Sequence, residues 1–151
     1  MLMKKLFIYS SFTGSGELVS KEFESHGYEL RKVVEKHKFP KSFFWSIFEG
    51  GFRAGIKVKG KLVNYDNNID DYDDIVIGSP IWNGTFPPVS NSILKQTNFT
   101  NKKITFALYS GSGEAKKAVK RIKKQFGEVK IIILKEPKKY LEELRKLKEL
   151  F

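Results

Sequence analysis

Three short stretches rich in serine, threonine and glycine carry the chemistry that this sequence offers. The first comprises Ser11, Phe12, Thr13, Gly14, Ser15 and Gly16. Such a turn at the start of a helix presents main-chain N–H groups and hydroxyls to an anion, and the helix dipole favours negative charge there. It lacks the Gly-Lys-Ser/Thr of a Walker A loop and the glycine spacing of a dinucleotide fingerprint. Because it contains no lysine, we expect neutral donors alone to hold a phosphomonoester; an ordinary helix-capping turn is the alternative.

The second and third stretches add an aromatic ring and more small residues. The second comprises Pro80, Ile81, Trp82, Asn83 and Gly84, and the third comprises Ser110, Gly111, Ser112 and Gly113. A tryptophan in such a turn is either part of the core or a stacking surface for a flat ligand. Its combination with a phosphate-binding turn favours stacking. The Asn-Gly pair beside it tolerates positive φ, as a tight turn requires.

Each stretch follows an apolar run typical of a buried strand, at residues 5–9, 75–78 and 104–109. We expect two more strands at 28–34, an edge strand, and at 129–134. Helical patterns lie between the strands, near residues 15–26, 43–54, 89–96, 113–126 and 138–150. This alternation predicts an α/β fold, a doubly wound five-stranded parallel sheet of order 2-1-3-4-5 with helices on both faces. The three stretches then meet at the carboxyl ends of the strands, where open α/β sheets bind ligands.

Two further segments lead to local expectations. The last helical pattern is amphipathic, and we expect Leu141, Leu144 and Leu147 to face inward. The acidic segment 70–74 precedes a parallel strand, so it belongs at the amino end of the sheet, away from the crevice. We interpret it as a solvated turn rather than a metal site.

Composition narrows the class of protein. We expect one domain over the 151 residues, 1–151, and a monomer. The sequence has no cysteine, which excludes disulfides, thiolate metal sites and cysteine nucleophiles. Without a membrane-length apolar stretch or a leader pattern, we expect a cytoplasmic location. The net charge of +11 is concentrated from Lys102 onward, where 15 lysines and arginines face 6 glutamates. We interpret this as a solvated face rather than a nucleic-acid site, because no nucleic-acid-binding motif accompanies it.

The three stretches together resemble the flavodoxin family. Ser11-Phe12-Thr13-Gly14-Ser15-Gly16 resembles the family's phosphate turn, Ser/Thr-x-Thr-Gly-x-Thr. Gly78-Ser79-Pro80-Ile81-Trp82 resembles its Gly-Ser/Thr-Pro-x-Trp, and Ser110-Gly111-Ser112-Gly113 matches its glycine-rich loop after the fourth strand. The chain resembles a short-chain flavodoxin over nearly its whole length. The resemblance implies bound FMN and one-electron transfer at low potential, with Trp82 stacked on the flavin and the Asn83–Gly84 peptide changing orientation beside it.

The chain departs from the family pattern in three ways. Gly16 stands where the family has a phosphate-binding threonine, and the third loop lacks the tyrosine that often covers the outer face of the flavin. The chain is also basic where flavodoxins are acidic, so we expect acidic redox proteins as partners. An alternative on the same scaffold is a flavin-dependent NAD(P)H, quinone or nitro reductase. An open flavin face would suit such an enzyme, whereas the shortness of the chain favours an electron carrier.

Overall fold

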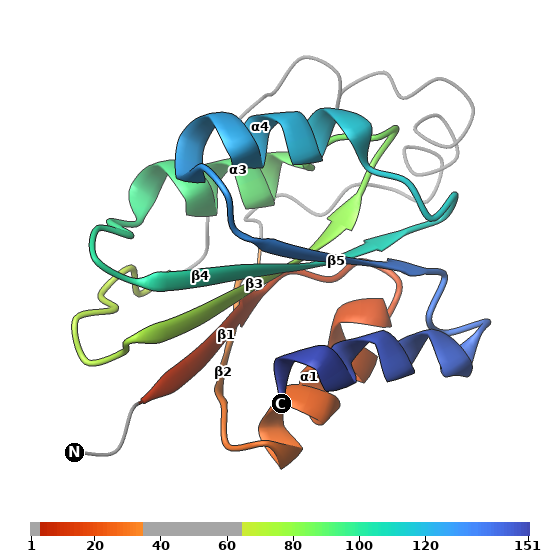
Figure 1. Ribbon diagram of the computed structural model, residues 1–151, viewed down its shortest axis with the longest axis horizontal. Coiled ribbons are helices and arrows are strands. Elements are labelled where there is room, and N and C mark those ends of the chain that lie inside the picture. The colour runs from red at the N-terminus through yellow and green to blue at the C-terminus, as the bar shows by residue number, and fades with distance from the viewer. Residues whose placement is uncertain (1–3, 35–64) are drawn as a thin grey trace.

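The structure is a computed structural model that describes residues 4–34 and 65–151 (Figure 1). Its elements in chain order are β1 (Lys5–Tyr9), α1 (Ser15–Ser25), β2 (Glu29–Lys32), β3 (Asp74–Ile81), α3 (Pro88–Gln96), β4 (Lys103–Ser110), α4 (Lys116–Phe126), β5 (Lys130–Lys135) and a 3-10 helix, η2 (Leu141–Leu150). The aromatic helix expected at 43–54 lies outside the described residues.

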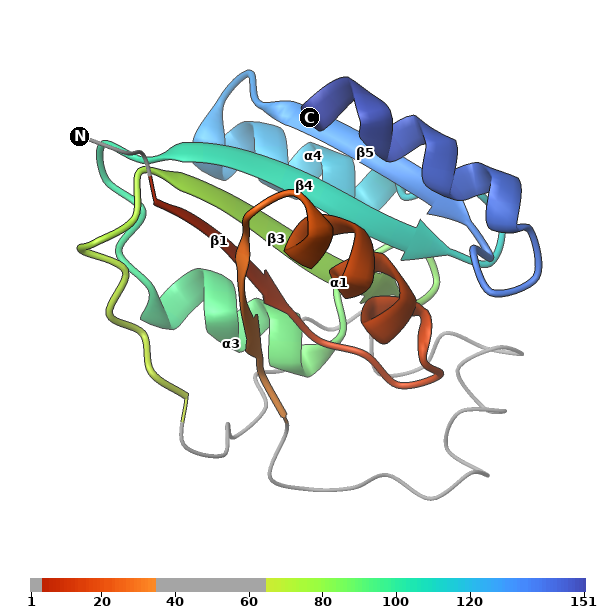
Figure 2. The same cartoon turned by 90° about the horizontal axis from the view of Figure 1, so that it is seen from below.

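The sheet has five parallel strands in the order β2-β1-β3-β4-β5, which confirms the expected topology. Helices α3 and α4 cover one face, and α1 and η2 cover the other (Figures 1 and 2). The inner strands are apolar on both sides because helices bury both faces of the sheet. β2 lies at one edge of the sheet, as its alternating sequence predicts, and its charged residues Glu29 and Lys32 are exposed.

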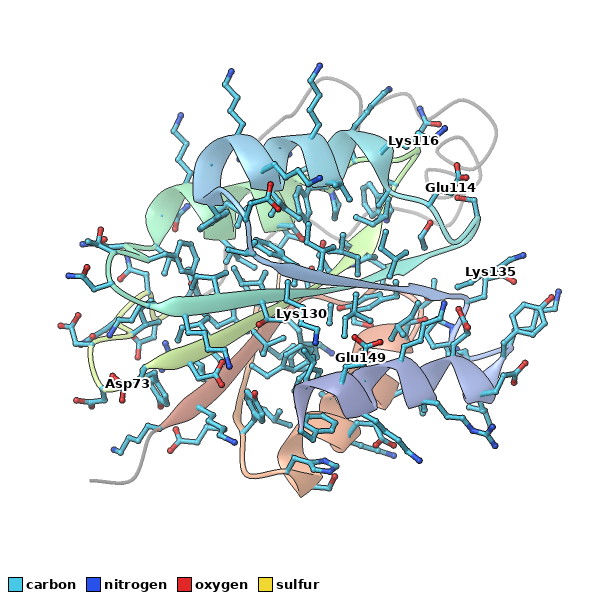
Figure 3. All side chains as sticks on the ribbon, in the orientation of Figure 1. Asp73, Glu114, Lys116, Lys130, Lys135 and Glu149 are labelled. Atoms are coloured by element: carbon cyan, nitrogen blue, oxygen red, sulfur yellow. The ribbon has the colours of Figure 1, made fainter. Side chains whose placement is uncertain are left out.

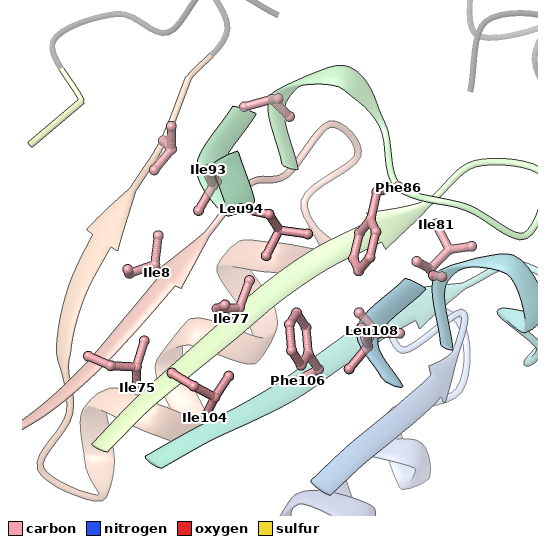
Figure 4. Packing of buried hydrophobic residues seen from close by; sticks show 14 of the residues in the cluster. Ile8, Ile75, Ile77, Ile81, Phe86, Ile93, Leu94, Ile104, Phe106 and Leu108 are labelled. Atoms are coloured by element: carbon pink, nitrogen blue, oxygen red, sulfur yellow. The ribbon is translucent and has the colours of Figure 1, made fainter. Parts of the chain in front are cut away.

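Successive residues of each inner strand contribute to opposite cores. Phe7 and Val76 pack with Phe23 of α1 and Leu147 of η2 in one core. In the other, Ile8, Ile77 and Phe106 lie beneath α3, which contributes Ile93 and Leu94 (Figure 4). Because the two cores clamp the sheet from both sides, the carboxyl ends of β1, β3 and β4 are fixed relative to one another.

Strand β3 is longer than its sequence indicates and includes Pro80 and Ile81, which we assigned to a loop. Its pairing with β1 ends at Gly78, whereas its pairing with β4 continues to Ile81, opposite Ser110. Pro80 has no N–H, so it is tolerated where one side of the strand is no longer paired. The ligand-side loop therefore begins only at Trp82.

The last helix differs from expectation in its type and in one inward residue. It is a 3-10 helix, in which residues three apart lie on one side. The leucines at 141, 144, 147 and 150 recur at that spacing of three. Leu147 is fully buried and Leu144 packs against the same core, but Leu141, at the start of the helix, is 60% exposed. The expectation that Leu141 faces inward is therefore wrong.

The acidic segment lies at the amino end of the sheet, as expected, but its last residue is not solvated. Asp74 is buried, and the Tyr28 hydroxyl donates a hydrogen bond to its carboxylate at 3.3 Å. The neighbouring Asp70, Asp71 and Asp73 are exposed. Within the described ranges, no helix is both long and apolar enough to cross a membrane.

Candidate functional site

A pocket of about 670 Å³ opens at the carboxyl ends of β1, β3 and β4. This volume lies in the usual range for small-molecule and cofactor sites. The pocket is lined by Phe12, Thr13, Ser15, Pro80, Ile81, Trp82, Asn83, Gly84, Tyr109, Ser110, Gly111, Ser112, Glu136, Pro137, Lys138 and Lys139. All three stretches singled out in the sequence contribute to this one site.

The first stretch, the 11–16 turn, connects β1 to α1. Gly14 has φ +93°, and its carbonyl accepts the first helical hydrogen bond from the Leu18 amide at 3.1 Å. The Gly16 amide donates to Ser11 Oγ at 3.0 Å, so these two groups bond each other. Thr13 and Ser15 line the pocket. The turn thus presents Thr13 and Ser15 to the pocket, while the bond between Ser11 and Gly16 holds its shape.

Gly16 is a glycine because its surroundings leave no room for a side chain. A Cβ at this position would lie 2.5 Å from Ser11 Cβ, 2.9 Å from the Ser10 carbonyl and 2.9 Å from the Tyr109 hydroxyl. That hydroxyl donates to the Ser10 carbonyl, and burial raises the pKa of Tyr109 well above its ordinary value, so Tyr109 stays neutral. The threonine of the family pattern is therefore excluded at position 16 by the turn itself, by the end of β1 and by Tyr109 of β4.

A charged pair braces the same end of α1. Glu17, in the first turn of α1, contacts Lys32 at the carboxyl end of β2. Burial works to raise the pKa of Glu17, but hydrogen bonds from Lys32 and Ser11 outweigh it, and the pKa is lowered. The same contact raises the pKa of Lys32. Glu17 therefore stays ionised at neutral pH, and through Ser11 it is linked to the 11–16 turn.

Lys138 brings a positive charge to the turn. Its Nζ donates to the Thr13 carbonyl, and it would lie 3.3 Å from a Cβ placed on Gly14. We expected neutral donors alone to hold a phosphate because the turn itself contains no lysine, and the structure adds a cationic side chain from another part of the chain. The lysine belongs to the loop between β5 and η2. That loop reaches the turn because η2 and α1 pack on the same face of the sheet (Figure 2).

Two aromatic rings form part of the pocket wall. Trp82 follows β3 and is only 7% exposed, and its ring lies 4.6 Å from that of Phe12, centroid to centroid, at 46°. Both residues line the pocket. Trp82 is therefore at once a core residue and part of the site, two roles that its sequence position left open. Phe12, which we placed only in the phosphate turn, is an aromatic neighbour of Trp82.

The 82–85 turn is a two-residue hairpin. The Trp82 amide donates to the Thr85 carbonyl at 2.9 Å, and the Thr85 amide donates back at 3.1 Å. Asn83 and Gly84 between them have φ values of +51° and +80°, a combination that Asn-Gly adopts readily. The Gly84 carbonyl also accepts a bond from the Ala118 amide in α4 at 2.9 Å. The Asn83–Gly84 peptide thus lies at the pocket between two anchored ends.

The third stretch and the loop after β5 form the remaining wall. Ser110 Oγ donates to the Glu114 carbonyl at 2.7 Å, and the Ser110 carbonyl accepts from the Glu136 amide at 3.0 Å. Glu136 has φ +38°, an uncommon value for a residue with a side chain. Hydrogen bonds from the amides of Lys139 and Tyr140 to its carbonyl, both 2.9 Å, hold it there. This loop is therefore a fixed part of the pocket.

Comparison with known proteins identifies the family. The family model described as Flavodoxin matches residues 55–147, which is more than half of the chain. The chain belongs to the flavodoxin family. No curated protein matches this flavodoxin-family chain.

Three solved structures share its fold at low sequence identity. A presumed flavoprotein from Bacteroides uniformis is 17% identical with a TM-score of 0.74, covering 96% of this chain and 99% of that one. A flavoprotein from Lactobacillus acidophilus, solved in complex with FMN, is 21% identical with a TM-score of 0.61, covering 93% and 98%. The apo form of an NADH:FMN oxidoreductase is 8% identical with a TM-score of 0.53, covering 97% and 88%. At these identities the likeness concerns the flavodoxin-like α/β fold.

Most of the residues predicted from the sequence line this one pocket, and four of them do not. Ser11, Gly14, Gly16 and Gly113 do not line it. Sequence reasoning missed Tyr109 and the loop residues Glu136, Pro137, Lys138 and Lys139. Tyr109 was assigned only to its strand. No local motif marks the loop at 136–139, which reaches the pocket by tertiary packing alone.

Proposed function

We propose that this flavodoxin-family chain binds FMN in the pocket and carries electrons between redox proteins. The observation that carries the proposal is the single pocket in which the 11–16 turn and the ring of Trp82 meet. The turn offers hydroxyls and the start of a helix to a phosphate, and Trp82 and Phe12 offer aromatic surface to a flat ring. When bound, FMN supplies the one-electron chemistry, while the protein binds it, orients it and limits its contact with water.

The test is reconstitution with the three natural flavin forms. We expect the purified protein to show a flavin visible spectrum and to release FMN on denaturation. The apoprotein should bind FMN more tightly than riboflavin, because riboflavin carries no phosphate for the turn. FAD should also bind less tightly than FMN, because its phosphate is esterified to AMP and is no longer a terminal group. Equal affinity for FMN and riboflavin would place the phosphate outside the 11–16 turn.

A second candidate is a flavin-dependent reductase on the same scaffold. The third-loop residues Gly111 and Ser112 are exposed and small, which favours an accessible ligand on that side. The fold is also that of an NADH:FMN oxidoreductase. Steady-state oxidation of NADH or NADPH by the holoprotein, without an added reductase, would favour the enzyme over the carrier.

The basic surface supports a proposal for the partner. Helix α4 exposes Lys116, Lys117, Lys120, Lys123 and Lys124, and side chains on this helix point away from the sheet (Figure 3). The amino end of α4 lies at the pocket, because the Ala118 amide donates a hydrogen bond to the carbonyl of Gly84, a pocket residue. We propose that an acidic redox protein docks beside this end of α4.

We expect electron transfer with an acidic partner to slow as ionic strength rises from about 0.01 M to 0.1 M, because the Debye length falls from about 30 Å to 10 Å. The Lys116→Gln variant should lower the rate at low salt more than Lys124→Gln does, since Lys124 lies at the far end of the helix. Stopped-flow measurements check both effects. Electron-transfer rates that do not depend on ionic strength would contradict the docking proposal and indicate that these lysines serve only solubility.

The 82–85 turn supports a proposal about reduction. We propose that the Asn83–Gly84 peptide changes orientation when the bound flavin is reduced and protonated. Gly84→Val should then disfavour the second orientation by roughly 1–3 kcal/mol, the scale of local backbone strain, and lower the midpoint potential. Redox titration of the holoprotein measures this shift.

The structure adds a necessary control, because Gly84 already has φ +80° and a side chain there costs stability before any reduction. Gly27 has φ +85°, and a Cβ at either glycine would meet nothing within 4 Å. Gly27→Val should therefore destabilise the protein similarly and leave the potential unchanged. A Gly84→Val potential equal to that of Gly27→Val would mean that another group responds to reduction.

A further inference from the structure

The loop between β5 and η2 is built to hold Lys138 over the 11–16 turn. Pro137, just before it, is buried. The Glu136 amide bonds the Ser110 carbonyl at 3.0 Å, and the Glu136 carbonyl accepts from the Lys139 and Tyr140 amides. Lys138 is thus preceded by residues fixed to β4 and followed by the turn into η2. The backbone at Lys138 is therefore held in place, and the Lys138 Nζ donates a hydrogen bond to the Thr13 carbonyl.

The charge of Lys138 is not used within the described part of the chain. Its neighbour Lys139 lies 4.0 Å from the Glu136 carboxylate, and Glu17 near the turn is paired with Lys32. No carboxylate of residues 4–34 or 65–151 lies within 4.0 Å of Lys138 Nζ. An ammonium group has three donors, and the Thr13 carbonyl takes one of them. Two donors and a full positive charge remain at the mouth of an anion-binding turn.

We propose that Lys138 is a ligand of the FMN phosphate, supplied to the turn from the opposite end of the chain. This inference rests on the proposed function. Two observations on the turn make such a ligand useful. Position 16 cannot carry a threonine hydroxyl, because Ser11, Ser10 and Tyr109 fill the space. The Gly16 amide is also occupied by Ser11 Oγ. A charge-assisted bond from Lys138 replaces donors that the turn itself does not offer.

The experiment compares FMN with riboflavin, which share the ring system and differ in the phosphate. Dissociation constants are measured by fluorescence titration of the apoprotein for the unaltered chain, Lys138→Gln, Lys138→Arg and Lys130→Gln. Lys130→Gln removes the same charge at the other end of β5, where Lys130 pairs with Glu149 at 3.4 Å (Figure 3). Each titration is repeated at about 0.01 M and 0.1 M salt, because screening weakens a phosphate–lysine contact.

We expect Lys138→Gln to raise the dissociation constant of FMN about tenfold or more, as loss of a charge-assisted hydrogen bond predicts. Riboflavin affinity should stay within about twofold, and the salt dependence of FMN binding should fall. Lys138→Arg should retain most of the affinity, and Lys130→Gln should behave like the unaltered chain. Thermal unfolding of each apoprotein confirms that the variants are folded.

Three outcomes would overturn the inference. The first is an equal loss for FMN and riboflavin, which would make Lys138 a structural residue of the pocket. The second is a Lys138→Gln protein with unchanged FMN affinity and salt dependence, while the unaltered chain still prefers FMN; the proposed function would then stand without this ligand. The third is an unaltered chain that binds neither flavin, which would remove the proposed function together with the inference.

Discussion

Replacing Gly16 by threonine is expected to destabilise the protein and to weaken FMN binding, although the family pattern has threonine there. A side chain at this position meets Ser11 Cβ at 2.5 Å and the Ser10 carbonyl at 2.9 Å. Real Cβ atoms do not approach other atoms so closely, so the turn or the end of β1 must shift. Overpacking of this kind costs about 1–3 kcal/mol, and it displaces the groups that face the pocket. Urea denaturation and FMN titration measure the two effects.

A double-mutant cycle shows whether Tyr109 of β4 contributes to the destabilisation caused by Gly16→Thr. Tyr109→Phe removes the hydroxyl that lies 2.9 Å from the position of the new Cβ, together with its bond to the Ser10 carbonyl. If the crowding is as described, the cost of Gly16→Thr should be smaller in the Tyr109→Phe background, because contacting residues couple. A Gly16→Thr protein with unchanged stability and tighter FMN binding would contradict this account of the turn.

Replacing Trp82 by alanine is expected to have the largest effect of any single change at the site. Trp82 is 7% exposed and packs against Phe12, so its loss removes both core packing and a wall of the pocket. Truncation of a buried tryptophan costs about 3–5 kcal/mol of unfolding free energy. We expect Trp82→Ala to lose flavin affinity as well, for FMN and riboflavin alike, because the ring system and not the phosphate is affected. Trp82→Phe should retain part of both properties.

Fluorescence distinguishes stacking on the flavin from packing alone. If the flavin stacks on Trp82, the tryptophan emission should be quenched in the holoprotein and should recover when the flavin is removed. Trp45, which lies outside the described residues, contributes to the same signal, so the measurement uses a Trp45→Phe background. Trp82 emission that does not change on addition of FMN would assign this residue to the core and leave Phe12 as the aromatic contact.

The sheet and the position of the site could be predicted from the sequence because both depend on local patterns. Runs such as 5–9 and 104–109 are apolar at every position except Lys5 and Thr105, which marks strands buried on both faces. Serine and glycine directly after them mark the strand ends. In a parallel sheet all carboxyl ends meet at one edge, so the strand order alone placed the three stretches together.

Features of the site that depend on contacts between distant residues could be seen only in the tertiary structure. Lys138 reaches Thr13 across 125 residues of sequence, and no pattern near either residue indicates the contact. The requirement for glycine at position 16 likewise comes partly from Tyr109 on another strand. Local sequence determined which segments are strands and turns, because backbone propensity and periodicity act over a few residues. The charge beside the 11–16 turn and the space within it were decided by packing, which depends on which helices share a face of the sheet.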